Sequence, residues 1–148
     1  MTDIVFNIAL GKIKTYAELG AAADALIMVP LEATGLVADS VMRDYDDLAA
    51  LLAGASNEQT TVGRKTLANV MVTVDDTNDR VAIDCDNVSW TAPTGNAVGA
   101  VVICYDADTG AGTDSAIIPL TKHGITWTPD GNDFSLTVAD WFRATSSA

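Results

Sequence analysis

The sequence predicts a mainly β protein, an antiparallel β-sandwich or compact barrel, and two stretches carry this prediction. In the first stretch, on either side of a polar loop, Val70, Val72 and Val74 alternate with Met71 and Thr73, and Val81, Ile83 and Cys85 alternate with Ala82, Asp84 and Asp86. A period of two is typical of half-buried strands, and the single loop indicates an antiparallel hairpin. The second stretch, AVVICY at 100–105, is apolar at every position. It predicts a strand that is covered on both faces, at the centre of the fold.

The tryptophans agree with a β core. Val88 and Trp90 continue the alternation but on even numbers, so the phase slips at Asp86-Asn87, which indicates a bulge or tight turn. Trp127 has the same parity as Ile125, so both Trp90 and Trp127 are expected to face inward. Core packing is therefore preferred to an aromatic platform for stacking sugars.

Further strands are expected on either side of this centre. Residues 125–127 and 134–138 alternate around a turn that contains Pro, Gly and Asn, which predicts a second hairpin. The apolar runs at 26–31 and 116–120 each contain a proline, which favours an edge strand or a strand end. The spacing of all these runs predicts about seven to nine strands.

One helix is predicted, over residues 40–53. Asp39 or Ser40 is a suitable N-cap, and Gly54 is a suitable end. Its apolar stripe would consist of Val41, Tyr45, Leu48 and Leu52.

The chain can be divided into an N-terminal part, 1–64, and a β-rich outward lobe, 65–148, although one continuous domain is also possible. Residues 4–10 and 26–31 are apolar pieces without hairpin turns, so we expect an N-terminal arm whose surface meets a partner. The alternative is that these pieces are edge strands of the same sandwich. The candidate residues for contacts with a partner or a sister subunit are Ile4, Phe6, Ile8, Leu10, Tyr16, Leu26, Met28 and Leu31.

Composition excludes some partners. The formal net charge is -12 and the basic residues are scattered, so there is no stripe to neutralise phosphates and nucleic acid is not an expected partner. An acidic membrane surface would repel the chain, and no run is long enough for a transmembrane helix. The N-terminus lacks the features of a secretory signal, so we expect synthesis in a cytoplasm, with Cys85 and Cys104 as free thiols. A charged fraction of 19% favours either an assembly or a well-filled core.

Catalytic and metal motifs are not recognisable. His123 is the single histidine and is expected in a surface loop, so no Ser-His-Asp or Cys-His set can be assembled. Asp106, Asp108 and Gly110 begin like a calcium loop, but the twelfth position is Ile117, where an EF-hand needs a bidentate Glu. The acids at 75–79 are interpreted as turn residues. We therefore expect no enzyme activity, no catalytic or metal-binding residues and no cofactor.

Several motifs resemble one family. FNIALGKIKTYAEL, ALIMVPLEATGL, RDYDDLAALLAG, VTVDDTNDRVAIDCDNVSWTA, AVVICYD, TPDGNDFSLTV and the final WFR are similar to small virion proteins of tailed phages. These proteins are assigned as capsid decoration (cement) or head-fibre proteins. The resemblance covers most of the chain and its motifs are structural, so it transfers no active site.

The resemblance implies a non-enzymatic virion protein, made in the host cytoplasm, that binds the exterior of the assembled head. Its implied partners are the major capsid protein and itself, most often as a homotrimer. The acidic charge agrees, because an acidic protein should sit outside a DNA-filled shell. Two other functions stay open: a tail-tube or head–tail connector component, and a carbohydrate-binding β-sandwich module.

Overall fold

The computed structural model describes residues 2–19, 23–54 and 56–146, and the fold they form is mainly β. The described residues form ten strands: β1 (Ile4–Val5), β2 (Ala25–Glu32), β3 (Lys65–Thr66), β4 (Met71–Asp75), β5 (Arg80–Asp84), β6 (Val88–Trp90), β7 (Val98–Asp106), β8 (Ile118–Trp127), β9 (Phe134–Leu136) and β10 (Phe142–Thr145). The helical segments are η1 (Asn7–Ala9), α1 (Ile13–Glu18), α2 (Asp39–Met42), α3 (Leu48–Ala53) and η2 (Asp114–Ala116).

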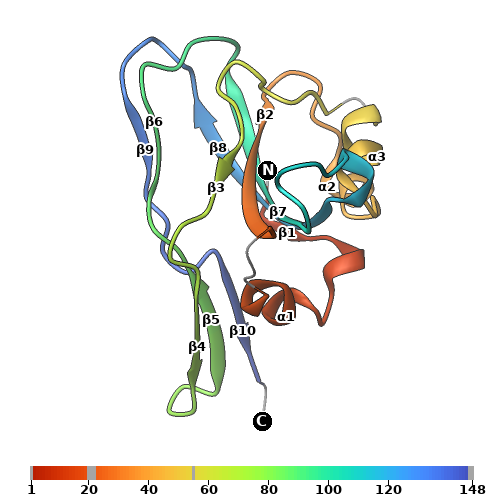
Figure 1. Ribbon diagram of the computed structural model, residues 1–148, viewed down its shortest axis with the longest axis vertical. Coiled ribbons are helices and arrows are strands. Elements are labelled where there is room, and N and C mark those ends of the chain that lie inside the picture. Colours follow the sequence, from red (N-terminus) through yellow and green to blue (C-terminus); the bar gives the residue numbers. More distant parts are fainter. Residues whose placement is uncertain (1, 20–22, 55, 147–148) are drawn as a thin grey trace.

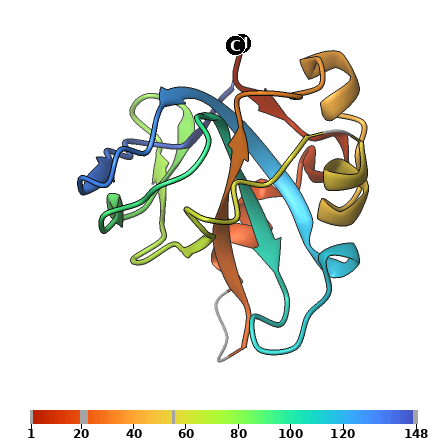
Figure 2. The ribbon, with the colours of Figure 1, turned by 90° about the horizontal axis from the view of Figure 1, so that it is seen from above.

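The strands form three antiparallel sheets. The largest has the order β1-β8-β7-β2-β3, the second β10-β5-β4, and the third pairs β6 with β9. The two small sheets lie on one side of the large sheet, and α2 and α3 lie on the other (Figure 1). Figure 2 shows the same three layers from above. The arrangement is sandwich-like, as the sequence predicts.

The central strand is β7, also as predicted. Its side chains alternate between two apolar cores, because successive residues of a strand point to opposite faces. Val101 and Ile103 face the core beneath the small sheets, together with Trp90 and Trp141. Val102 and Cys104 face the core beneath the helices.

The hairpin predicted from the first stretch is β4 and β5, with Val72 opposite Ile83 and Val74 opposite Val81. The hairpin extends below the rest of the molecule in Figure 1, and β10 pairs with β5 on the side away from β4. The phase slip at Asp86-Asn87 marks the passage of the chain from β5 to β6, which belong to different sheets.

The second predicted hairpin is wrong. β9 does not pair with β8: Phe134 lies opposite Trp90 and Leu136 opposite Val88, in the sheet of β6 and β9. The turn after Trp127 carries the chain from one layer to the other, and the rings of Trp127 and Phe134 stack with centroids 3.9 Å apart. The alternating runs are therefore strands, but their contact is face to face.

The single helix predicted over 40–53 is also wrong, because two short helices, α2 and α3, replace it. Asp47 breaks the run: its backbone is extended, and its carboxylate accepts from Ala50 N at 2.8 Å as the N-cap of α3. The buried side chains are Met42, Leu48 and Leu51, whereas Val41 of the predicted stripe is 49% exposed. Gly54 is the C-cap of α3.

The proline-containing runs lie one strand in from the edge of the large sheet. In β2, the carbonyl of Pro30 accepts from Gln59 N at 2.9 Å, away from β7. In a strand, the backbone N and O of one residue point to the same side. The position where Pro30 lacks an N–H therefore also faces away from β7, toward a loop and not toward a regularly paired strand, so no ladder hydrogen bond is lost. The neighbours β1 and β3 are only two residues long.

Candidate interaction surfaces

The N-terminal segment is attached to the large sheet. β1 pairs with β8 through Ile4 opposite Lys122 and Val5 opposite Thr121. Phe6 N then donates to Leu120 O at 3.0 Å. The Phe6 side chain has no exposure and packs in the core beneath the helices. This segment is thus an edge strand of the sandwich, the alternative that the sequence left open.

A buried lysine, Lys122, fixes this segment. The side chain of Lys122 has no exposure, and its ammonium donates to Asp39 Oδ1 at 2.7 Å and to the backbone carbonyl of Thr2. Asp39 Oδ2 also accepts from Thr2 N at 3.1 Å and from Thr2 Oγ1 at 2.7 Å. The hydrogen bond from Lys122, followed by that from Thr2, lowers the pKa of Asp39 to about 2.

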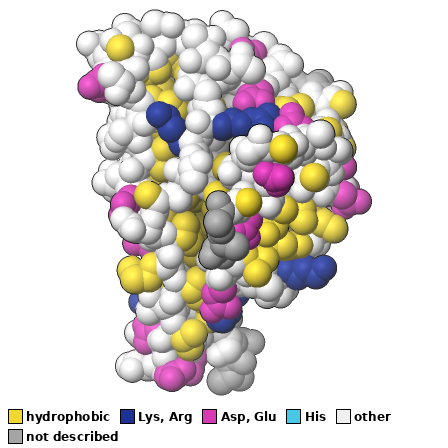
Figure 3. Space-filling view, viewed as in Figure 1, with side chains coloured by type: hydrophobic (Ala, Val, Ile, Leu, Met, Phe, Trp, Pro, Cys, Tyr) yellow, Lys and Arg dark blue, Asp and Glu magenta, His cyan; other side chains and the backbone are white. Residues whose placement is uncertain are grey.

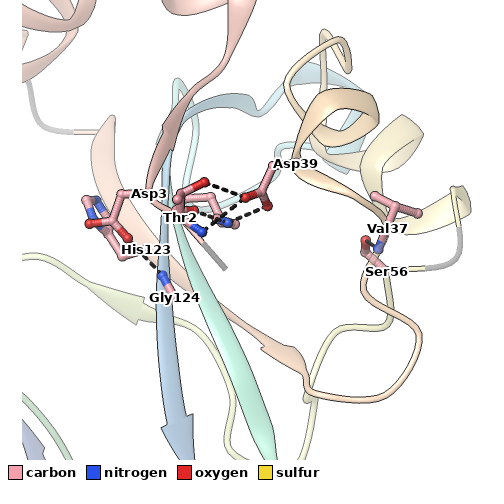
Figure 4. A network of polar contacts seen from close by, with 8 residues as sticks. Thr2, Asp3, Val37, Asp39, Ser56, His123 and Gly124 are labelled. Carbon is pink, nitrogen blue, oxygen red and sulfur yellow. Dashed lines mark hydrogen bonds and ion pairs between the residues drawn. The ribbon is translucent and has the colours of Figure 1, made fainter.

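His123 lies beside this network and corrects a prediction. It is part of β8, within a strand and not in a surface loop. Its Nδ1 is 3.2 Å from Asp3 Oδ2, and its Nε2 is 3.0 Å from Thr121 Oγ1. Asp3 Oδ1 accepts from Gly124 N at 3.0 Å. These contacts hold the first residues of the described chain against β8 (Figure 4).

Half of the predicted contact residues belong to the core of the chain itself. Four of them are at most 4% exposed: Phe6, Leu26, Met28 and Leu31. These four side chains are enclosed in the two apolar cores of the chain, so in this fold they have almost no surface to offer a partner. Three more are half-buried, namely Ile4, Ile8 and Tyr16. Leu10 is 61% exposed, and for these last four residues contact with a partner stays a prediction.

The exposed part of the N-terminal segment lies next to α2. Asn7 N donates to Arg43 O at 2.8 Å, and Asn7 Nδ2 donates to Asp44 Oδ1 at 2.6 Å. These bonds place η1 beside the end of α2. Leu10 directly follows η1, and Val41 of α2 is 49% exposed. Two exposed apolar side chains therefore sit on neighbouring, hydrogen-bonded segments.

A polar hollow of about 290 Å³ lies between β3 and the loop that follows β7. Arg64 lines it and forms ion pairs with Glu58 and Asp114: its Nη2 is 2.6 Å from Glu58 Oε2, and its Nη1 is 2.7 Å from Asp114 Oδ1. Hydrogen bonds to Glu58 and then Asp114 raise the pKa of Arg64, and the bond from Arg64 lowers the pKa of Asp114. The cluster ties the loop to the body, a connection that sequence spacing does not reveal.

The acidic loops are turn caps. Asp108 Oδ1 accepts from Gly110 N at 3.0 Å and from Ala111 N at 3.1 Å. Asp75 accepts from Asn78 Nδ2 at 2.7 Å and from Arg80 Nε at 3.1 Å. Among the described residues, no group of three or more His, Cys, Asp or Glu side chains is arranged to hold a metal ion.

The two cysteines are free and buried, as predicted. Burial, followed by the nearby Asp84 and Asp86, raises the pKa of Cys85 to about 11. Burial also raises the pKa of Cys104. Both side chains are therefore protonated thiols at neutral pH, with little nucleophilic character.

An apolar hollow of about 210 Å³ lies over the large sheet, near the segment between β9 and β10. Met28, Val101 and Ile103 contribute from the sheet, and Trp141 lies among the other lining residues. Trp141 is 7% exposed, and its Nε1 has no hydrogen-bond partner among the described residues.

No helix in the described part of the chain has the length and apolar character needed to cross a membrane. Comparisons of the chain with protein-family models, with curated proteins and with solved structures found no match.

Proposed function

We propose that this protein is a non-enzymatic capsid decoration protein of a tailed phage, which binds the outside of the assembled head and stabilises it. The proposal rests on the resemblance of the sequence motifs to small virion proteins. Its partners would be the major capsid protein and further copies of the chain. The acidic net charge of -12 suits a position outside a DNA-filled shell.

One structural observation supports this function and suggests where contact occurs. The segment from Thr2 to Leu10 is fixed by the ion pair of Lys122 and Asp39, by β-pairing and by the burial of Phe6. On this fixed frame, Leu10 presents a side chain that is 61% exposed. A pre-ordered apolar side chain contributes more to binding than a mobile one, because less conformational entropy is lost on contact.

The test is co-sedimentation with expanded heads that lack the protein. The wild type should bind at micromolar concentration, where weak but specific interfaces operate. Leu10→Ser should weaken binding about tenfold, as expected for the loss of one exposed anchor. Ala111→Ser is the control, since Ala111 is exposed in the loop that follows β7 and its replacement should leave binding unchanged.

Absence of wild-type binding to such heads would refute the proposal. If both serine variants bound as tightly as the wild type, the contact assigned to Leu10 would be refuted, but the proposed function would not. Assembly of the purified protein into rings or tubes would instead favour the tail-tube or connector alternative.

A further inference from the structure

The edge of the small sheet β10-β5-β4 differs from the edges of the large sheet. The edge strands β1 and β3 of the large sheet are two residues long, which limits pairing with another chain. β4 is five residues long and, among the described residues, pairs only with β5, in a register without any bulge. Its outer edge therefore presents a row of backbone N–H and C=O groups.

The sequence of β4, MVTVD, has one charged residue, Asp75 at its hairpin end, and otherwise lacks the usual features that protect an edge. It has no lysine, no proline and no bulge, and its Val and Thr residues have high β-propensity. Met71 and Val74 are each 59% exposed. In Figure 3, yellow side chains lie along the lower left, where Figure 1 places this hairpin. Such an edge is suited to pairing with another strand.

One face of this sheet is apolar as far as its free end. Two rows of cross-strand neighbours form this face. The row nearer the core, called the inner row, consists of Val72, Ile83 and Phe142, and the row nearer the hairpin tip, called the outer row, consists of Val74, Val81 and Ala144. Ile83 has no exposure, but Val74 and Ala144 are exposed. The apolar core of the chain therefore covers the inner row but leaves the end residues of the outer row exposed to solvent.

A hollow of about 590 Å³ adjoins the same edge, and its lining includes Leu19, the C-cap residue of α1, together with Val70 and Val72. Leu19 is 44% exposed. The surface next to β4 thus offers a recess with a mixed polar and apolar lining, beside the outer edge of the strand.

We propose that two copies of this chain pair through their β4 strands, antiparallel about a two-fold axis at Thr73. In this register Val72 lies opposite Val74 of the partner subunit, because paired residues of antiparallel strands share a face. The inner row of each copy continues into the outer row of the other, and Val74 of the partner subunit lies next to the hollow lined by Leu19. One six-stranded sheet results, with its apolar face continuous.

Charge favours this antiparallel register over other pairings of two copies. The hairpin tip is acidic, with Asp75, Asp76 and Asp79. In the antiparallel register Asp75 faces Met71 of the partner subunit, and the two tips point in opposite directions. A tip-to-tip arrangement would bring like charges together, which is unfavourable. Both copies are acidic overall, so added salt should strengthen the dimer by screening their repulsion.

The test is oxidative cross-linking of single-cysteine additions to the full chain. In Thr73→Cys, the new residue lies on the axis, and paired Cα atoms about 4.5–5.5 Å apart suit a disulfide. We expect a cross-linked dimer on a non-reducing gel. Thr77→Cys at the hairpin tip is the matched control and should stay monomeric, since the two tips are far apart. The native Cys85 and Cys104 are buried, so the wild type should not cross-link.

A second measurement does not depend on thiols. Sedimentation of the wild type should show a monomer–dimer equilibrium between about 1 and about 100 μM, the range expected for a weak interface. Val74→Lys should shift the equilibrium at least tenfold toward monomer, because lysine is a typical protector of edges. Val74→Thr, which keeps β-propensity, should dimerise like the wild type, and circular dichroism would confirm that both variants fold.

A wild type that stays monomeric throughout this range overturns the inference. So does cross-linking through Thr77→Cys in place of Thr73→Cys. The inference does not depend on the proposed function: failure to bind phage heads leaves the dimer intact, and loss of the dimer in Val74→Lys can be measured without heads.

Discussion

The ammonium of Lys122, which has no solvent exposure, lies 2.7 Å from a carboxylate oxygen of Asp39. The two residues are 83 positions apart, and their contact joins β8 to the start of α2. Asp39 is itself 27% exposed at its side chain, so the two partners differ in their access to water. This asymmetry leads to the first two predictions.

Replacing Asp39 should lower the free energy of unfolding more than replacing Lys122. Asp39→Asn leaves a buried, charged lysine without its carboxylate, which should lower the free energy of unfolding by about 3 kcal/mol. Lys122→Met should cost less, about 1 kcal/mol, because it fills a similar volume and the remaining carboxylate can be hydrated. Urea denaturation of the three proteins measures the difference, and equal losses would contradict this account.

The same pair should make folding sensitive to acid. The folded-state pKa of Asp39 is lowered from 3.8 to about 2, so this group stabilises the fold fully above its ordinary pKa. That stabilisation is lost as the pH falls from 3.8 through about 2. The unfolding free energy of the wild type should therefore fall across this window more steeply than that of Asp39→Asn. Parallel curves for the two proteins would show that Asp39 does not titrate in this way.

Arg64 is expected to hold the loop after β7 in place. Arg64→Lys keeps the charge but cannot bind Glu58 and Asp114 with a guanidinium fork, and should cost about 1–2 kcal/mol because the cluster is partly exposed. Hydrogen exchange should increase at the amides of η2, from Asp114 to Ala116. The amides of β7 serve as an internal reference, and an equal increase there would indicate global destabilisation instead.

Local periodicity predicted the strands well. The uninterrupted apolar run of β7 marked the central strand, and the alternation of β4 and β5 with their polar loop marked a hairpin. Partners farther along the chain were not accessible in this way. The alternation around Trp127 and Phe134 is the same whether the strands pair edge to edge or stack face to face, so the partner of β9 was missed.

The helix was mispredicted for a different reason, and four of the eight candidate contact residues are buried. Spacing in residues 40–53 fits one helix, but Asp47 caps a second one, and capping overrides a stripe of four residues. Apolar residues such as Phe6 and Met28 are suited equally to a core and to an interface. Lys122 was not identified as a core residue, because a lysine signals exposure unless its partner is known.

The last prediction concerns the irregular end of β7. The register with β8 shifts between Val98 and Ala100, and Gly99 lies at that shift. A Cβ at Gly99 would come within 2.6 Å of Ala33 Cα, a backbone atom that cannot move aside as a side chain could. Ala33 is held there, since its N donates to Ala97 O at 2.7 Å. Gly99→Ala should therefore lower stability by about 1–3 kcal/mol, as overpacking does elsewhere.

Gly110→Ala is the matched control for this substitution. Its added Cβ would meet nothing closer than Asp108 Oδ1 at 3.4 Å, and Gly110 does not have a positive φ. The change should leave stability unchanged or raise it by up to about 1 kcal/mol, since alanine restricts the unfolded chain. Thermal unfolding of the two variants beside the wild type gives the comparison. If Gly99→Ala proved as stable as Gly110→Ala, β7 could move away from Ala33 without loss of stability. The close approach of Ala33 would then not explain why position 99 is a glycine.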